Sequence, residues 1–245
     1  MSTRRITAPV VDLLRAPEGP RDRQLLYGDT VRVEDEADGW SRVVADKDGY
    51  PGWLRSEWLG LEQAATHWVS AAATHAYEQA DMKSPDRLSL SFGSRVAALS
   101  EAGSFIETNL GFIPKVHLAP EGRVLSDPVA VAALFLGTPY LWGGNSRFGL
   151  DCSGLVQAAL LVCGRECPGD SGAQEHALGT ALPEGTAPRR GDLMFWKGHV
   201  AWVADPHTLL HANAHHMAVQ YEPIAEAIPR ILAQGDGPVT AHKRL

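Results

Sequence analysis

Short apolar alternations separated by turn signals fill the first quarter of the chain. Apolar and polar residues alternate within each of three stretches, Leu25–Val33, Trp40–Ala45 and Trp53–Leu59. The pairs Asp38-Gly39 and Asp48-Gly49 separate these stretches and favour tight turns. A period of two is typical of strands that bury one face. Residues 1–62 are therefore expected to form a small antiparallel barrel.

A weaker copy of this pattern follows about 65 residues later. Four positions match at one offset: Gly28, Val31, Val33 and Trp40 with Gly93, Val96, Ala98 and Phe105. Leu59 then matches Leu118 at a shorter offset, which places the missing residues where a hairpin tip can shorten without touching the core. We therefore expect a second barrel over residues 63–122.

Helical patterns first appear after residue 122. Asp127 is a candidate N-cap for a helix that begins at Pro128 and runs to Leu136. A second helix is expected from Cys152 to Gly164, because apolar residues follow at spacings of three and four. Residues 165–190 are rich in Gly and Pro. Four strands then follow, at 193–196, 199–204, 208–212 and 217–221, and residues 223–232 could form a short helix. Residues 123–245 thus predict one mixed domain, and the whole chain an α+β fold.

Composition narrows the classes of partner. The net charge is −7 and no Lys/Arg cluster is sustained, which argues against a nucleic-acid partner. No stretch approaches the roughly 20 apolar residues that span a bilayer, and the start MSTRRITAPVVDLL has no apolar run typical of a secretory signal. We expect a cytoplasmic location and no membrane partner. In that reducing compartment the three cysteines are expected to lack disulfides.

The segment GLDCSGLVQAAL places Cys152 where a loop enters the second helix. The positive end of a helix dipole stabilises a thiolate and lowers the pKa of the thiol, so Cys152 is a candidate nucleophile. The alternative is a buried structural cysteine, the commoner role of a lone Cys. Cys163 and Cys167 are interpreted as structural, since Cys163 lies on the apolar stripe of the helix.

A base for this nucleophile is predicted from the hairpin register of the histidine-rich segment. If Ala204 pairs with Thr208 around a three-residue turn, paired residues sum to 412 and odd-numbered residues share a face. His211 then lies opposite Ala201 and diagonal to His199, at a Cα separation of roughly 7 to 8 Å that two imidazoles can bridge. One ring could accept the thiol proton while the other orients it. Either histidine could be the direct base, since one inserted residue would swap the faces.

A metal site is the alternative to this interpretation of His199 and His211. A zinc site formed by Cys152, His199 and His211 is the metallic competitor, although no Asp, Glu or Cys accompanies the two histidines at metal-ligand spacing. His215 and His216 are adjacent, would point to opposite sides of a strand, and are expected at the surface or behind the site.

The segments around these residues resemble the NlpC-type cysteine peptidases. The resemblance covers roughly residues 125–240 and includes PYLWGG, DCSGL, GDLMFW, GHVAWV and LLHANAHHMAV. It implies a papain-like fold and a catalytic set of Cys152, His199 and His211, with Tyr140 helping the Cys152 backbone N–H to stabilise the oxyanion. It also implies that three neighbours contact substrate: Trp142, Asp151 and Ser153. For Tyr140 the alternative is packing toward the barrels, and for Asp151 it is a helix N-cap, which is compatible with contact.

The two expected barrels refine the resemblance. Paired SH3-like barrels ahead of an NlpC domain are similar to cytoplasmic murein-tripeptide endopeptidases, which cut the γ-D-glutamyl-diamino-acid bond of small peptides with a free N-terminal L-alanine. No cofactor is implied. The first barrel of such enzymes recognises the free amine, and Tyr50 with Asp22 or Glu18 would supply the aromatic and acidic contacts. The alternative for both acids is a solvated loop charge. An inactive wall-binding module and an acyltransferase of the same superfamily are the competing functions.

Overall fold

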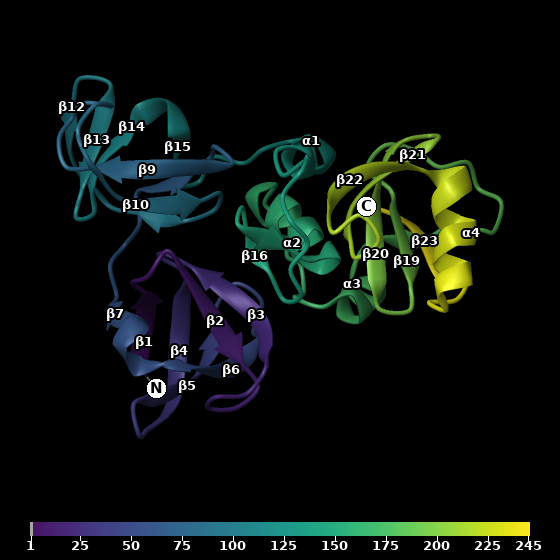
Figure 1. The fold of residues 1–245 in the computed structure, drawn as a ribbon, viewed down its shortest axis with the longest axis horizontal. Coiled ribbons are helices and arrows are strands. Elements are labelled where there is room, and N and C mark those ends of the chain that lie inside the picture. Colours follow the sequence, from purple (N-terminus) through teal and green to yellow (C-terminus); the bar gives the residue numbers. More distant parts are fainter. Residues whose placement is uncertain (1) are drawn as a thin grey trace. The chain divides into compact units, whose positions relative to one another are not determined.

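A computed structural model describes residues 2–245, which divide into two compact units (Figure 1). Unit 1 extends to Arg123 and also includes Asn145–Phe148, whereas unit 2 comprises Val124–Gly144 and Gly149–Leu245. Among residues 2–245, no helix has both the length and the apolar character needed to cross a membrane.

The first barrel is formed by one seven-stranded sheet in the order β3-β2-β6-β5-β4-β1-β7. Its elements are β1 (Ser2–Ile6), β2 (Val10–Leu14), β3 (Arg21–Leu26), β4 (Thr30–Ala37), β5 (Trp40–Ala45), β6 (Pro51–Arg55), the 3-10 helix η1 (Ser56–Trp58) and β7 (Leu59–Leu61). Alternate side chains such as Val31, Val43 and Leu54 form a buried core. The stretch Leu25–Val33 is not one strand as its alternation suggested, because Gly28 has a positive φ of 82° and turns the chain between β3 and β4.

The second barrel repeats this plan. It contains β8 (His67–Val69), β9 (Ala73–Tyr77), β10 (Asp86–Ser91), β11 (Arg95–Val96), β12 (Ala98–Ala102), β13 (Phe105–Thr108), β14 (Gly111–Pro114), η2 (Lys115–His117) and β15 (Leu118–Pro120). Strand β8 pairs with β11 and β15 as β1 pairs with β4 and β7. Gly93 has φ 86°, like its counterpart Gly28, and both 3-10 helices end directly before the matched Leu59 and Leu118. The expected duplication is visible in these equivalent positions.

The turn at Gly28 lies against the second barrel. The N–H of Arg95 donates to the carbonyl of Tyr27 at 2.8 Å, and a Cβ at Gly28 would lie 2.2 Å from the carbonyl oxygen of Arg95. Only glycine fits this approach. The segment Asn145–Phe148 joins the same unit, since Asn145 and Gln24 exchange hydrogen bonds between backbone N–H groups and side-chain oxygens at 3.2 and 3.3 Å. Nothing in the sequence pattern indicated this role for residues 145–148.

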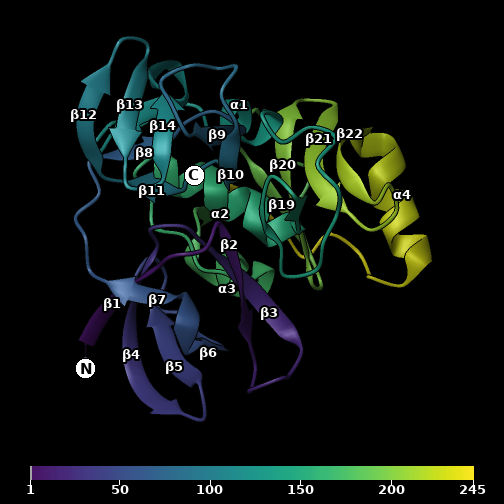
Figure 2. The same cartoon turned by 60° about the vertical axis from the view of Figure 1, so that its left-hand side comes forward.

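Unit 2 is built on a six-stranded antiparallel sheet in the order β18-β23-β19-β20-β21-β22. The elements from α1 onward are α1 (Pro128–Ala133), β16 (Asn145–Ser146, in unit 1), β17 (Gly149–Leu150), α2 (Cys152–Val162), α3 (Ser171–Ala177), β18 (Thr180–Ala181), β19 (Leu193–Trp196), β20 (His199–Asp205), β21 (Thr208–Asn213), β22 (Ala218–Pro223), α4 (Ile224–Gln234) and β23 (Ala241–Arg244). Helix α4 runs along one side of this sheet (Figures 1 and 2), and its Ala227 and Ile231 pack on Ala201, Val203 and Leu209.

The α+β fold class is confirmed, with local corrections. Helix α1 ends at Ala133, three residues before the expected Leu136. The stretch 165–190 contains α3, whose seven residues are too few to show a clear period. Residues 223–232 do begin a helix, α4. The C-terminal strand β23 had no counterpart in the prediction, because it pairs with β19 from far along the chain.

Candidate active site

Cys152 is the first residue of α2, and its predicted position at a helix start is confirmed. The side chain of Asp151 caps the helix: its Oδ1 accepts hydrogen bonds from the Gly154 N–H at 2.6 Å and the Ser153 hydroxyl at 3.0 Å. Its Oδ2 accepts from the Gly143 N–H at 3.0 Å. This carboxylate therefore fixes both the helix start and the loop before it, while the dipole of α2 favours a thiolate on Cys152.

The sulfur of Cys152 lies beside the start of β20. Its Sγ is 4.0 Å from the carbonyl oxygen of Gly198, the residue directly before His199. Helix α2 also packs against β20 and β21. Cys152 is 7% exposed, so a substrate carbonyl would meet the sulfur in a largely dry environment. The structure thus brings the candidate nucleophile to the histidine hairpin within one unit.

His199 and His211 form the predicted pair. The Nε2 of His199 lies 2.9 Å from the Nδ1 of His211. The pairing of Trp202 with Leu210 gives the expected sum of 412, but the expected turn is wrong: Asp205, rather than Ala204, pairs with Thr208. A bulge between Val203 and Asp205 offsets this tighter turn, so the register at the two histidines is unchanged.

Two further residues extend the pair, and the sequence argument did not include them. The Nε2 of His211 lies 2.9 Å from Oε2 of Glu222 on β22. Arg230 of α4 holds that carboxylate with two hydrogen bonds, from Nε at 2.7 Å and from a terminal nitrogen at 2.6 Å. His211 is fully buried and Glu222 is 5% exposed. Both ring nitrogens of His211 are thus already engaged, which leaves it no free lone pair for a zinc ion.

The surroundings keep both rings neutral. Burial first, and then the neighbouring His211 and Arg230, lower the pKa of His199 from its ordinary value of 6.5 to about 3. Burial also lowers the pKa of His211, although Glu222 opposes this change. Burial would raise the pKa of Glu222, but the hydrogen bonds from His211 and Arg230 outweigh it and hold that pKa below the usual range. A neutral His199, which His211 links to the ionised Glu222, can accept a proton from a thiol.

Tyr140 is half-buried and electrostatically close to the nucleophile. Burial raises its pKa above the ordinary value of 10.0, and the charges of Cys152 and Asp151 raise it further. Its backbone N–H donates to the carbonyl of Met217 at 2.9 Å. The phenol therefore stays protonated at neutral pH and can donate a hydrogen bond to a developing oxyanion. This role stays a prediction, as do the catalytic roles of Cys152, His199 and His211.

The predicted substrate contacts of unit 2 surround the helix start. Trp142 is 64% exposed and precedes Gly143, whose N–H binds Asp151. Asp151 and Ser153 are both buried and hydrogen-bonded to each other. The N-cap alternative for Asp151 is therefore observed, and substrate contact by these three residues stays a prediction.

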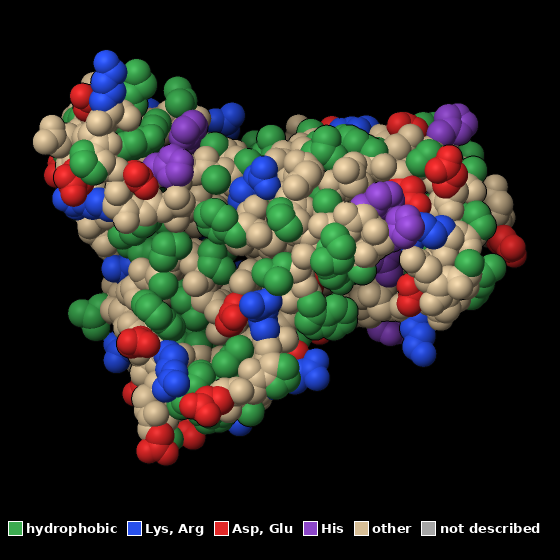
Figure 3. All heavy atoms as spheres, viewed as in Figure 1, with side chains coloured by type: hydrophobic (Ala, Val, Ile, Leu, Met, Phe, Trp, Pro, Cys, Tyr) green, Lys and Arg blue, Asp and Glu red, His purple; other side chains and the backbone are tan. Residues whose placement is uncertain are grey.

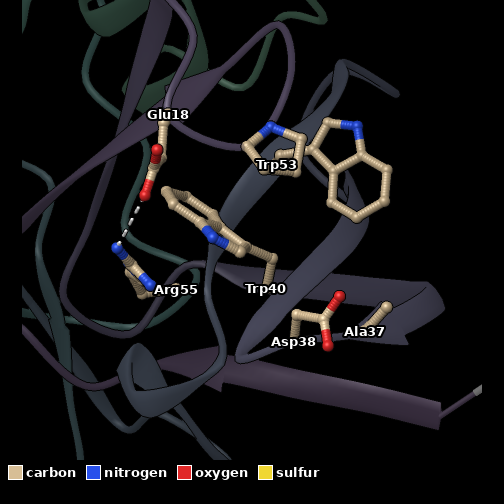
Figure 4. A pocket seen from close by; sticks show the side chains of 7 residues that line it. Glu18, Ala37, Asp38, Trp40, Trp53 and Arg55 are labelled. Atoms are coloured by element: carbon tan, nitrogen blue, oxygen red, sulfur yellow. Dashed lines mark ion pairs between the residues drawn. The ribbon is translucent and has the colours of Figure 1, made fainter.

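The candidate contacts of the first barrel belong to unit 1. Tyr50 packs against the barrel core, and Asp22 forms an ion pair with Arg15 at 2.5 Å. Glu18 lines a hollow of about 380 Å³ whose walls include Trp40, and it faces Arg55 at 3.7 Å (Figure 4). Arg55 in turn covers the Trp40 ring at 4.1 Å from its centroid. Both acids thus have a basic partner, and their contact with a substrate amine stays a prediction.

Two further cysteines and two further histidines take no part in this hydrogen-bonded series. Cys167 is buried and its Sγ accepts a hydrogen bond from Gln174, whereas burial and the charge of Asp127 raise the pKa of Cys163. His215 and His216 are exposed in the turn before β22, as expected of surface residues.

On the face shown in Figure 3, basic side chains are scattered among acidic ones.

Two family models and several curated proteins match parts of the chain. Residues 13–59 match the family model described as the bacterial dipeptidyl-peptidase SH3 domain, and residues 137–230 match the NlpC/P60 family. A γ-D-glutamyl-L-lysine dipeptidyl-peptidase of Bacillus subtilis is 28% identical over 191 residues, covering 71% of this chain and 63% of that protein. A Bacillus cereus protein of the same name is 26% identical over 237 residues, covering 83% and 70%. The chain thus spans less than two thirds of the Bacillus subtilis relative.

A solved structure gives the same fold. An NlpC/P60 family protein from Bacillus cereus superposes with a TM-score of 0.82 at 22% identity, covering 99% of each chain. This likeness shows the fold, and the two family matches with the Bacillus relatives support an NlpC-type cysteine peptidase with an N-terminal SH3-like domain.

Proposed function

We propose that the protein hydrolyses the γ-D-glutamyl bond to a diamino acid in small murein peptides with a free N-terminal L-alanine. The observation that carries the proposal is the position of Cys152 at the start of α2, with its sulfur 4.0 Å from the Gly198 carbonyl beside the hydrogen-bonded His199–His211 pair. The names of the two Bacillus relatives support the bond and the peptide class. A cytoplasmic role in recycling wall peptides is part of the proposal.

The first half of the reaction forms a thioester. His199 accepts the proton of Cys152, and the sulfur attacks the γ-carbonyl carbon of D-glutamate. The carbonyl oxygen becomes an oxyanion that the Cys152 N–H and the Tyr140 hydroxyl stabilise. The C–N bond then breaks, and the departing amine of the diamino acid takes the proton from His199. Cys152, His199 and Tyr140 all belong to unit 2, and these steps require His199 to start neutral and Tyr140 to start protonated.

The second half returns the enzyme to its starting state. Neutral His199 accepts a proton from water, and the water oxygen attacks the thioester carbon. The C–S bond breaks, the sulfur regains its proton from His199, and L-alanyl-D-glutamate is released. Water supplies both the hydroxyl and the hydrogen of the products, so the balance needs no oxidant, reductant or cofactor.

Selection for small peptides is proposed to depend on the free amine. A charged amine can form charge-assisted hydrogen bonds with a carboxylate, whereas an acylated amine leaves that carboxylate unpaired at a cost. Asp22 or Glu18 is the proposed carboxylate, and Tyr50 is the proposed aromatic contact.

Mass spectrometry of peptide digests tests this proposal. The full-length protein is incubated with L-alanyl-γ-D-glutamyl-lysine, with its diaminopimelate counterpart, and with the N-acetylated form of each. Cleavage of the free peptides to L-alanyl-D-glutamate, with little cleavage of the acetylated ones, is expected. Equal cleavage of both forms would overturn amine recognition.

Paired cysteine variants provide the control. Cys152→Ala is expected to abolish cleavage, whereas Cys163→Ala at the other end of α2 keeps it. If the wild-type protein cleaves neither free peptide although iodoacetamide alkylates Cys152, the hydrolase proposal is wrong. A wall-binding module or an acyltransferase would then be the better interpretation.

A further inference from the structure

The polar side chains behind the candidate nucleophile follow one diagonal across three adjacent strands. His199 on β20, His211 on β21 and Glu222 on β22 are joined by contacts of 2.9 Å each. In the register of β21 with β22, His211 pairs with Gln220, so Glu222 lies two residues further along the same face. Arg230 of α4 ends the series with its two bonds to Glu222.

The charge at one end of this series determines the proton positions along it. An ionised carboxylate only accepts hydrogen bonds, so Nε2 of His211 must carry a hydrogen and donate it to Glu222. A neutral His211 then has a bare Nδ1, which can only accept from the Nε2–H of His199. A neutral His199 is left with a bare Nδ1, the nitrogen that can take a proton from Cys152.

The opposite tautomers would block the reaction. If His211 carried its hydrogen on Nδ1, its bare Nε2 would face the Glu222 carboxylate across 2.9 Å, lone pair to lone pair. His199 would then accept at Nε2 and carry its own hydrogen on Nδ1, where it could not receive the thiol proton. The buried carboxylate therefore selects the productive one of two arrangements.

We propose that Glu222 and Arg230 are positioning residues of the active site, which set the tautomers of His211 and His199 and so leave Nδ1 of His199 as the base. Neither residue touches the reacting atoms. Arg230 binds both carboxylate oxygens and so fixes the plane of the carboxylate toward His211. Its positive charge also balances Glu222 inside unit 2, where an unpaired carboxylate would be costly.

Replacement of Glu222 by Gln tests this role, which rests on the proposed use of Cys152 and His199. The amide can donate as well as accept, so it no longer selects one tautomer. For Glu222→Gln we expect kcat to fall by about 10- to 100-fold, the range seen when the partner behind a metal-bound histidine is removed. KM should change little, because the carboxylate does not contact substrate. Glu222→Asp and Arg230→Lys keep the charges of the two residues, so their kcat should lie between that of Glu222→Gln and that of the wild type.

Glu226→Gln is the matched control, since Glu226 is an exposed carboxylate on α4. It is expected to keep wild-type kinetics. Thermal unfolding identifies any variant that fails to fold. A Glu222→Gln protein that folds and keeps the wild-type kcat would overturn the proposal.

Two measurements without peptide separate this inference from the hydrolase proposal. Histidine ring ¹⁵N chemical shifts should show a single Nε2–H tautomer for both rings in the wild type and a mixture in Glu222→Gln. The rate of Cys152 alkylation by iodoacetamide should fall in the same variant. Loss of the single tautomer supports the inference even if no murein peptide is cleaved. An unchanged tautomer and alkylation rate refute it even if the wild type is an active hydrolase.

Discussion

Replacing Tyr140 with phenylalanine removes one hydroxyl and leaves the aromatic ring in place. The ring is expected to stay where it is, because the Tyr140 N–H binds the Met217 carbonyl at 2.9 Å and the backbone bridges to Leu150. The hydroxyl is a proton donor at neutral pH, since burial and then the charges of Cys152 and Asp151 raise the pKa of Tyr140. The substitution therefore deletes one proposed oxyanion donor with little other change.

The size of the effect follows from the exposure of the site. Removing one oxyanion donor from a buried hydrolase site costs about 100- to 1000-fold in kcat, or roughly 2.7 to 4 kcal/mol. Tyr140 is only half-buried, so water can replace part of the lost hydrogen bond. We therefore expect a loss near the lower end, about 100-fold in kcat. KM should change little, because the bond strengthens only when the oxyanion forms.

Steady-state kinetics on the free tripeptide, with Tyr221→Phe as the matched control, measure this effect. Tyr221 is 43% exposed and lies on β22 with its side chain opposite to that of Glu222. Alkylation of Cys152 should proceed at the wild-type rate in Tyr140→Phe, because that reaction forms no oxyanion. A fall in kcat of less than about tenfold, which is 1.4 kcal/mol, would refute the oxyanion role.

Three further predictions concern pH and stability. The acid limb of the kcat/KM profile should lie below pH 6.5. Burial, His211 and Arg230 lower the pKa of His199, and the ring stops acting as a base only when it becomes protonated. An acid limb at or above pH 6.5 would contradict this prediction. Asp192→Asn should cost about 2 kcal/mol at pH 7 in urea unfolding, because Asp192 is 1% exposed and binds His242 and Arg244. Burial would raise the pKa of Asp192, but its hydrogen bonds, first that with Arg244, lower this pKa overall. The stability that ionised Asp192 contributes is therefore complete above the unfolded pKa of about 3.9 and is lost as the pH falls below it. If Asp192→Asn cost as much free energy of unfolding at pH 3 as at pH 7, the ion pair would not be its cause. Gly28→Ala should lower the stability of the protein more than Gly39→Ala, for which we expect a cost of about 1 kcal/mol. Both glycines have a positive φ, but only a Cβ at Gly28 would meet a carbonyl oxygen, at 2.2 Å. Equal unfolding midpoints of the two variants would refute the steric argument.

Local signals were sufficient to predict one half of the candidate site. An N-cap, an apolar period and a terminal glycine located the helix that begins at Cys152, and these features act within a few residues. The histidine pair required only the register of one hairpin. That register survived an error in the turn, because the bulge in β20 compensated for the tighter loop. The alternation of faces, rather than the exact turn, therefore carried the prediction.

The other half depends on contacts that no local pattern specifies. Glu222 reaches His211 only because a turn that includes Met217, at a positive φ of 52°, sets the register of β22. Arg230 reaches Glu222 only because α4 begins directly after that strand and folds back on the sheet. The sequence segment 223–232 was ambiguous between helix and loop, so its one inward-facing arginine could not be aligned with the carboxylate.

These two halves also differ in how their geometry is stabilised. The histidines and Glu222 lie on three hydrogen-bonded strands, so a slip of one residue in either register would turn a ring or the carboxylate to the opposite face. Cys152 instead depends on the cap of its packed helix, because Asp151 binds the helix start and Gly143 together. Asp151→Asn keeps the size of the cap but leaves a single acceptor oxygen, which cannot bind both Gly154 and Gly143, and should therefore loosen the helix start while the ring tautomers stay fixed. Glu222→Gln should instead give a mixture of ring tautomers and leave the helix start intact. The sheet thus fixes the ring tautomers that we propose, and the cap of one helix fixes the position of the sulfur.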